Sequence, residues 1–204
     1  MKFVAVEGVD GAGKSTLVRL LKESLEADGH AVLTTREPGG TPPAEAIRSF
    51  LLSDEGASVP KGEQLRLVHT GRRHHVATKI KPALLNGQVV ISDRYELSSF
   101  VYQVAHAREE LEQEFRSMKQ ELDRILGDFL PTYIVLDLPD TEVERRLKNS
   151  DKLNHFDATS IDAIARRREA YHLGIAAVGD RHHILDATHS PEILVREARM
   201  LLGL

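Results

Sequence analysis

The chain has 204 residues, of which 41% are hydrophobic and 28% are charged, a composition typical of a chain that buries a core and does not stay disordered. Its 27 Lys and Arg residues against 31 Asp and Glu residues give a formal net charge of −4, which argues against a protein that binds nucleic acid backbones. With no cysteine, disulfides, thiolate nucleophiles and Cys-ligated metals are excluded. We expect a cytoplasmic protein with no targeting signal and no membrane span.

Five short β-branched runs recur along the chain between longer helical patterns. They cover residues 3–6, 31–35, 89–92, 133–136 and 182–185. Because these runs are apolar at successive positions and lie tens of residues apart, they predict a parallel sheet with helices on both faces. We therefore expect an α/β fold in which residues 1–204 form a single domain.

Helical patterns and loops fill the intervals between these runs. A leucine stripe at positions 17, 20, 21 and 25 predicts a first helix that begins at Gly13-Lys14 and ends near Gly29. The other expected elements are a loop over 54–62, helices over 63–85 and 109–125, and a loop over 149–155.

The segment between the first run and the first helix carries the strongest motif. Residues 8–15 read Gly-Val-Asp-Gly-Ala-Gly-Lys-Ser, which matches the G-x-x-x-x-G-K-[ST] pattern of a phosphate-binding loop. Its glycines let backbone N–H groups turn toward one point, and the helix dipole adds positive potential there. We expect Lys14 to reach the outer phosphates and Ser15 to supply an oxygen ligand for Mg²⁺. The alternative is a Gly-rich strand-to-helix turn without a ligand. The expected nucleotide-binding residues are Gly8, Asp10, Gly11, Ala12, Gly13, Lys14, Ser15 and Thr16.

A phosphate loop alone does not separate kinases from switch GTPases or mechanical ATPases. The chain has no Asn-Lys-x-Asp string after a strand that would read guanine, and it is too short to carry additional motor domains. A kinase that acts on a small molecule is therefore favoured.

Four further strings occur in a fixed order after the phosphate loop. They are Thr-Arg-Glu-Pro-Gly-Gly-Thr at 35–41, Ile-Lys-Pro-Ala-Leu at 80–84, Asp-Arg-Tyr at 93–95 followed by Ser98, Ser99, Tyr102 and Gln103, and Asp186-Ala187-Thr188. With the phosphate loop, they make the chain resemble bacterial thymidylate kinases over nearly its whole length. The resemblance implies a three-layer P-loop kinase fold with a five-stranded parallel sheet and a short lid over about 148–160. It also implies transfer of the ATP γ-phosphoryl group to deoxythymidine monophosphate (dTMP) with Mg²⁺, in an enzyme that is usually a homodimer.

Phosphoryl transfer requires the acceptor phosphate to lie in line with the γ-phosphate while negative charge is neutralised. We assign Arg94, just beyond the third strand, to both phosphates because its planar fork suits them. Asp93 is placed like the acidic residue that holds Mg²⁺ or its waters, although an Asp93–Arg94 salt bridge is an alternative. The resemblance makes Asp10 a candidate for the acceptor 3′-hydroxyl or the metal shell, and a turn residue is the other interpretation.

The resemblance also implies an acceptor pocket. In it, Arg48 binds the acceptor phosphate, Tyr102 packs on the deoxyribose where a 2′-hydroxyl would lie, and Arg72 bonds the base edge. Glu37 and Pro38 are expected to border the acceptor as well, and the bond between them is expected to be cis. The remaining expected residues are Val68, Ser98, Ser99 and Gln103 for the pocket, and Asp186, Ala187 and Thr188 for ATP.

Some basic residues have two interpretations. Arg36 either reaches the acceptor phosphate or lies on the surface. Arg73, His74 and His75 are expected to form a solvated helix face.

The sequence departs from the family at the base and at the lid. Val68 stands where the family usually has a phenylalanine that stacks on thymine, a contact worth roughly 1–3 kcal/mol, so another or modified pyrimidine is an alternative acceptor. Gly11-Ala12 carries no arginine, and an ungapped count places His155 at the usual lid arginine. We expect Lys152 to close over the phosphoryl group, with Lys148 as an alternative. A weakly catalytic nucleotide-binding homologue is the remaining alternative.

Overall fold

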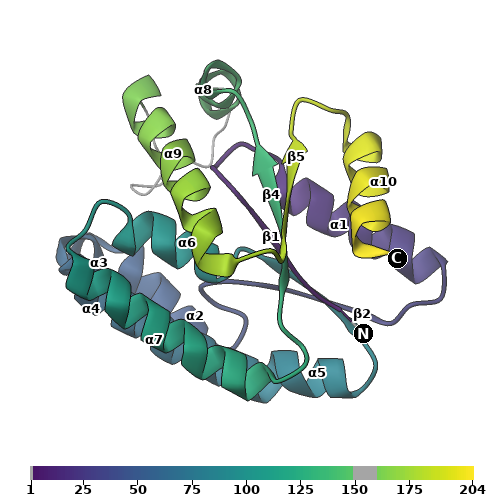
Figure 1. Cartoon of the computed structure of the whole chain (residues 1–204), viewed down its shortest axis with the longest axis horizontal. Helices are drawn as coiled ribbons and strands as arrows, with labels where there is room; N and C mark the ends of the chain where they lie inside the picture. Colours follow the sequence, from purple (N-terminus) through teal and green to yellow (C-terminus); the bar gives the residue numbers. More distant parts are fainter. Residues whose placement is uncertain (1, 149–159) are drawn as a thin grey trace.

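Five parallel strands form one sheet that is covered by helices on both faces (Figure 1). The structure, a computed structural model, describes residues 2–148 and 160–204. Its elements in chain order are β1 (Phe3–Gly8), α1 (Lys14–Ala27), β2 (Val32–Arg36), α2 (Pro42–Leu51), α3 (Asp54–Ser58), α4 (Lys61–His75), the π-helical turn η1 (Val76–Ile80), α5 (Lys81–Leu85), β3 (Val89–Asp93), α6 (Glu96–Ser99), the π-helical turn η2 (Phe100–Val104), α7 (Glu109–Leu126), β4 (Thr132–Asp137), α8 (Asp140–Lys148), α9 (Ile161–Val178), β5 (His182–Asp186) and α10 (Pro191–Leu202).

The strand order is β2-β3-β1-β4-β5, and every neighbouring pair is parallel. The strand β1 is buried at each of its six positions, as expected for a strand with helices on both faces. The predicted α/β fold and the five predicted strands are therefore confirmed. The chain places β2 and β3 on one side of β1 and then β4 and β5 on the other. The strand order therefore reverses at β1, and the carboxyl ends of the strands beside such a switch point border a crevice suited to ligands.

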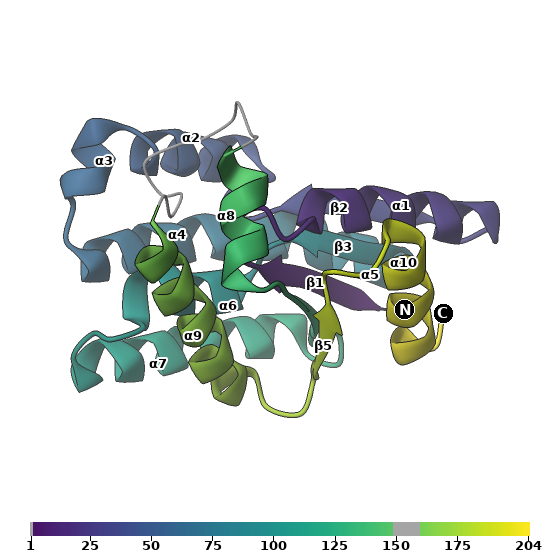
Figure 2. The same ribbon diagram turned by 90° about the horizontal axis from the view of Figure 1, so that it is seen from above.

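The helices form two layers. Figures 1 and 2 show α1 and α10 together on one side of the sheet, and α4, α5 and α7 on the other. The predicted leucine stripe explains the first layer, because Leu17, Leu21 and Leu25 of α1 are almost fully buried. Within the described ranges, no helix has the length and apolar character needed to cross a bilayer.

Two sequence expectations differ from the structure. The helix expected over 63–85 is interrupted by η1. Pro82, at the start of α5 just after this turn, has no N–H and so cannot donate an α-helical hydrogen bond back into it. The loop expected over 54–62 contains α3 and the start of α4, so that prediction was wrong for residues 54–58 and 61–62. Ser53 caps this short helix by accepting a bond from the Gly56 N–H at 3.2 Å. The expected loop over 149–155 lies outside the described residues, as does the expected lid apart from its ends.

Candidate active site

The phosphate loop has the backbone that its glycines allow. Gly8, Gly11 and Gly13 adopt φ values of 137°, 81° and 97°, in the region that favours glycine. At Gly8 a Cβ would also lie 2.6 Å from the Leu136 carbonyl oxygen. The Lys14 side chain folds back over the loop, and its Nζ donates to the Val9 carbonyl at 2.8 Å. The loop borders a polar cavity of about 460 Å³, which is large enough for a phosphate chain.

Ser15 and Asp93 bring two oxygen atoms together at the edge of this cavity. The Ser15 hydroxyl donates to Asp93 Oδ2 at 2.6 Å, because α1 begins beside the carboxyl end of β3. A hydroxyl and a carboxylate are ligands that suit Mg²⁺, which takes the rest of its shell from water and phosphate oxygens. Among the described residues, no group of three or more His, Asp or Glu side chains is placed to hold a metal ion. The pair therefore fits a magnesium ion that arrives with a nucleotide.

Arg94 lies between the phosphate loop and the helices that follow β3. Its backbone has a φ of 68°, a conformation that costs a non-glycine residue about 1–3 kcal/mol and recurs at functional sites. Its guanidinium donates to the Gly8 carbonyl at 3.2 Å and to the Tyr171 hydroxyl at 2.7 Å, and it also pairs with Asp10. Arg94 is thus paired with Asp10, and the alternative of an Asp93–Arg94 salt bridge was wrong.

The Asp10 carboxylate is surrounded by side-chain donors. It pairs with Arg94, accepts a bond from the Tyr102 hydroxyl at 2.8 Å, and lies 3.5 Å from Arg167 Nη1. Burial alone would raise the pKa of this carboxyl, but Arg94 and Lys14 hold it below its usual value. Asp10 is therefore an anion that joins three elements, the phosphate loop, η2 and α9.

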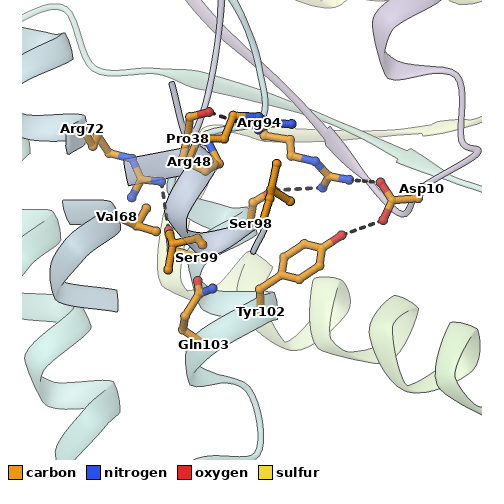
Figure 3. Close-up of a pocket in the computed structure, with 12 residues that line it drawn as sticks. Asp10, Pro38, Arg48, Val68, Arg72, Arg94, Ser98, Ser99, Tyr102 and Gln103 are labelled. Atoms are coloured by element: carbon orange, nitrogen blue, oxygen red, sulfur yellow. Dashed lines mark hydrogen bonds and ion pairs between the residues drawn. The ribbon is translucent and has the colours of Figure 1, made fainter. Parts of the chain in front are cut away.

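Next to Arg94, a second cavity of about 120 Å³ opens toward α2 and α4 (Figure 3). It is lined by Asp10, Pro38, Arg48, Leu51, Leu52, Val68, Arg72, Arg94, Ser98, Ser99, Tyr102 and Gln103. Every residue predicted for the acceptor lies on this wall except Glu37, which lines the phosphate cavity. Leu51 and Leu52 were not predicted, because their position depends on how α2 ends. The structure thus brings the predicted acceptor residues together.

Two arginines are held in place at this cavity. Arg72 is nearly buried, pairs with Glu37, and donates to the Ser99 hydroxyl at 2.9 Å (Figure 3). Arg48 donates to the Pro38 carbonyl at 3.1 Å. The Glu37–Pro38 bond is cis, as expected. Both guanidinium groups are therefore fixed by neighbours that face the cavity.

His75 corrects an expectation. It is fully buried, and hydrogen bonds join its Nδ1 to Glu37 Oε1 at 2.9 Å and its Nε2 to the Thr35 hydroxyl at 2.8 Å. Residues three apart share a helix face, so the helix that presents Arg72 to Glu37 presents His75 as well. The prediction of a solvated face is confirmed for Arg73 and His74, which are exposed, but it was wrong for His75.

Glu7 and Tyr171 are site residues that the sequence analysis missed. Glu7 is fully buried and accepts bonds from the Tyr95 N–H at 2.7 Å and the Ser98 hydroxyl at 2.6 Å. Burial raises the pKa of this carboxyl. An acidic residue inside an apolar strand was the available signal for Glu7, because a buried carboxyl needs partners. Tyr171 lies on α9, and the sequence gives no sign of its direction.

The turn after β5 lies beside the phosphate loop. Asp186 Oδ1 accepts bonds from the Thr188 N–H at 2.9 Å and from its hydroxyl at 2.7 Å. Arg146 of α8 donates to the Gly11 carbonyl at 3.3 Å and the Ala187 carbonyl at 3.2 Å. This unpredicted arginine therefore ties the phosphate loop to the turn that we expect to bind ATP.

The other basic residues considered in the sequence analysis lie either at the edge of the site or outside the described residues. Arg36 borders the phosphate cavity with 55% of its side chain exposed, and it pairs with Glu45 at 2.8 Å. Lys148 is exposed and pairs with Glu144 at 3.0 Å. Lys152 and His155 lie outside the described residues.

Comparison with known proteins agrees with this geometry. The family model described as thymidylate kinase matches residues 6–198. The chain is 41% identical over 195 residues to a thymidylate kinase of Bifidobacterium longum subsp. infantis, covering 93% of this chain and 81% of that protein. It is also 37% identical over 202 residues to a thymidylate kinase of Thiobacillus denitrificans, covering 98% of this chain and 96% of that protein. The chain belongs to the thymidylate kinase family.

Proposed function

We propose that this chain transfers the γ-phosphoryl group of ATP to dTMP, giving ADP and the diphosphate used to make dTTP. The observation that carries the proposal is that the phosphate cavity and the acceptor cavity share Asp10, Arg48 and Arg94. A donor phosphate and an acceptor phosphate bound in these cavities meet at two guanidinium groups. Thymidylate kinase relatives support dTMP over the other pyrimidines as the acceptor.

On the donor side, the backbone of residues 8–15 and Lys14 hold the phosphates of ATP, and Asp186-Ala187-Thr188 contact its base. Ser15 and Asp93 hold Mg²⁺, which when bound neutralises charge on the phosphates. The role of Lys14 at the donor phosphates is supported by its position, because Lys14 lines the phosphate cavity. Burial lowers its pKa to about 8, and bound phosphates would favour its charged form.

On the acceptor side, Arg48 and Arg94 bind the phosphate of dTMP and place it in line with the donor. Asp10 and Tyr102 contact the sugar, and Arg72 bonds the edge of the base. Val68 supplies an apolar wall for the thymine where a stacking ring is usual. Pro38, Ser98, Ser99 and Gln103 complete the pocket.

Other parts of the proposal rest on the resemblance. Residues 1–204 act as one domain, and the segment of about 148–160 is a lid from which Lys152 closes over the transferred group. Lys152 is favoured because Gly11 and Ala12 bring no cation to that place. We propose a homodimer in the cytoplasm that requires no nucleic acid partner.

A panel of nucleoside monophosphates with Mg-ATP tests the proposal, with ADP and the diphosphate product both measured. We expect ATP consumption only with an acceptor, and dTMP as the best acceptor. Lys14→Ala and Arg94→Ala should each lower kcat/KM by at least about 100-fold, since each removes a charge from the transition state. Arg73→Ala, which removes an exposed arginine from α4, is the matched control and should change little. Near-normal turnover in both site variants, or a modified deoxyuridylate severalfold better than dTMP, would contradict the proposal.

A further inference from the structure

Arg167 on α9 faces the two residues that we place at the acceptor sugar. Its Nη1 lies 3.5 Å from Asp10 Oδ2, and its guanidinium carbon lies 4.7 Å from the centre of the Tyr102 ring. Only 19% of the side chain is exposed. Arg167 lines neither the acceptor cavity nor the phosphate cavity, so it acts through Asp10 and Tyr102 and not by touching a nucleotide.

Tyr102 needs such support because of where it lies in the chain. It belongs to η2, a single π-helical turn, and such turns are less regular than α-helix and are frequent at functional sites. The Tyr102 hydroxyl donates to Asp10, while Arg94 approaches the same ring with its guanidinium carbon 5.3 Å from the ring centre. Cations near an aromatic face are attracted by its quadrupole. The Tyr102 ring is therefore held at its hydroxyl and by two guanidinium groups.

We propose that Arg167 is a positioning residue that fixes the Tyr102 ring against the acceptor sugar and so sets the preference for deoxyribose over ribose. The inference rests on the proposed function, in which Tyr102 contacts the sugar, and on the family resemblance, which implies that its ring packs where a 2′-hydroxyl would lie. A ring that can turn away opens that space, and the ribonucleotide gains more from the added room than the deoxynucleotide does.

The contacts of Arg167 allow positioning of the Tyr102 ring to be distinguished from an effect of its positive charge alone. Arg94 also pairs with Asp10, so we expect the carboxylate to keep a strong partner when Arg167 is removed. A guanidinium can lie flat on a ring while bonding a carboxylate, whereas a lysine ammonium is a compact point charge. A role in sugar selection therefore predicts that lysine restores the wild-type preference only in part. A role of charge alone predicts full restoration and equal losses with both sugars.

The test compares Arg167→Met and Arg167→Lys with Arg166→Met, which removes an exposed arginine from the preceding position of the same helix. For each protein, kcat/KM is measured with dTMP and with 5-methyluridine 5′-monophosphate, which has the same base on ribose. Dissociation constants of both nucleotides are measured by calorimetry without ATP. Thermal unfolding is measured for each variant to check that it is folded.

We expect the dTMP preference, in kcat/KM and in affinity, to fall at least about fivefold in Arg167→Met, as the loss of a cation–π contact suggests. The dTMP preference should fall by a smaller factor in Arg167→Lys, and Arg166→Met should keep the wild-type preference. A ratio within twofold of wild type in Arg167→Met, full restoration by lysine, or an equal drop in Arg166→Met would overturn the inference. A wild-type protein that phosphorylates neither nucleotide would instead contradict the proposed function, and the ratio of affinities would still decide the role of Arg167.

Discussion

Lys14 combines burial with a charge that the proposed reaction needs. Its side chain is almost covered, and Val9 accepts a bond from its ammonium. Burial, followed by the nearby Arg94, lowers the pKa of Lys14 to about 8. Without nucleotide, this lysine is therefore protonated in about half of the molecules at pH 8 and in nearly all of them at pH 6.5.

This pKa predicts that ATP binding takes up protons. Phosphates beside the ammonium favour its charged form and raise its pKa, so binding of Mg-ATP at pH 8 should take up about half a proton, and binding at pH 6.5 close to none. Calorimetry in two buffers of different ionisation enthalpy measures the uptake. Lys14→Arg is the control, because a guanidinium stays protonated throughout. Equal uptake in the control and the wild type at pH 8 would be inconsistent with this pKa.

Strands, helices and loops that are determined by their own residues could be predicted from the sequence. The inner strands β1, β3 and β4 are mostly apolar and buried along most of their length, as expected for parallel strands covered on both faces, whereas the edge strands β2 and β5 are mostly half-buried or exposed. The predicted ranges fall short of β1 and β4 by only one or two residues at an end. The phosphate loop was predictable because its glycine spacing fixes the backbone. In contrast, α3 depends on a cap by Ser53 and on the close approach of Gly56 to α2, where a Cβ would lie 2.0 Å from a carbonyl oxygen.

In the candidate site, too, some residues could be predicted from the sequence and others could not. The family resemblance identified Arg48, Arg72 and the other acceptor residues, and Tyr102 lies in one of the strings that carry that resemblance. The sequence did not predict that His75 would be buried or that Arg167 would face Asp10. Those directions follow from how α4 and α9 pack on the sheet, and a basic residue on a helix is more often solvated.

The layered fold as a whole buries one carboxyl group away from the site. Oε2 of Glu96 in α6 accepts a bond from the Tyr133 hydroxyl at 2.9 Å and lies 3.9 Å from Nζ of Lys119 in α7. The other carboxylate oxygen of Glu96, Oε1, has no hydrogen-bond partner among the described residues. Burial raises the pKa of the Glu96 carboxyl to about 7. Because an unfolded glutamate titrates near 4.3, ionisation of Glu96 opposes folding.

This shift predicts a stability that depends on pH. The contribution of Glu96 is fully present below the unfolded pKa and is lost as pH rises through about 7. Glu96→Gln avoids that loss, so the free energy of unfolding of the variant minus that of the wild type should be larger at pH 8 than at pH 5 by about 2 kcal/mol, in the direction of a more stable variant. Urea unfolding at both pH values measures this change, with Glu110→Gln on the exposed face of α7 as the control. An equal difference at the two pH values would show that Glu96 does not titrate between them.

The most direct test of the shared wall of Asp10, Arg48 and Arg94 is calorimetry with one molecule that spans both cavities. A suitable probe joins adenosine and thymidine through their 5′ oxygens by five phosphates. If both nucleotides bind side by side, the probe should bind once per chain and at least about 100-fold more tightly than ATP or dTMP alone, and Arg94→Ala should remove most of that gain. A probe that binds no more tightly than the better single nucleotide would contradict two adjoining phosphate sites in this chain.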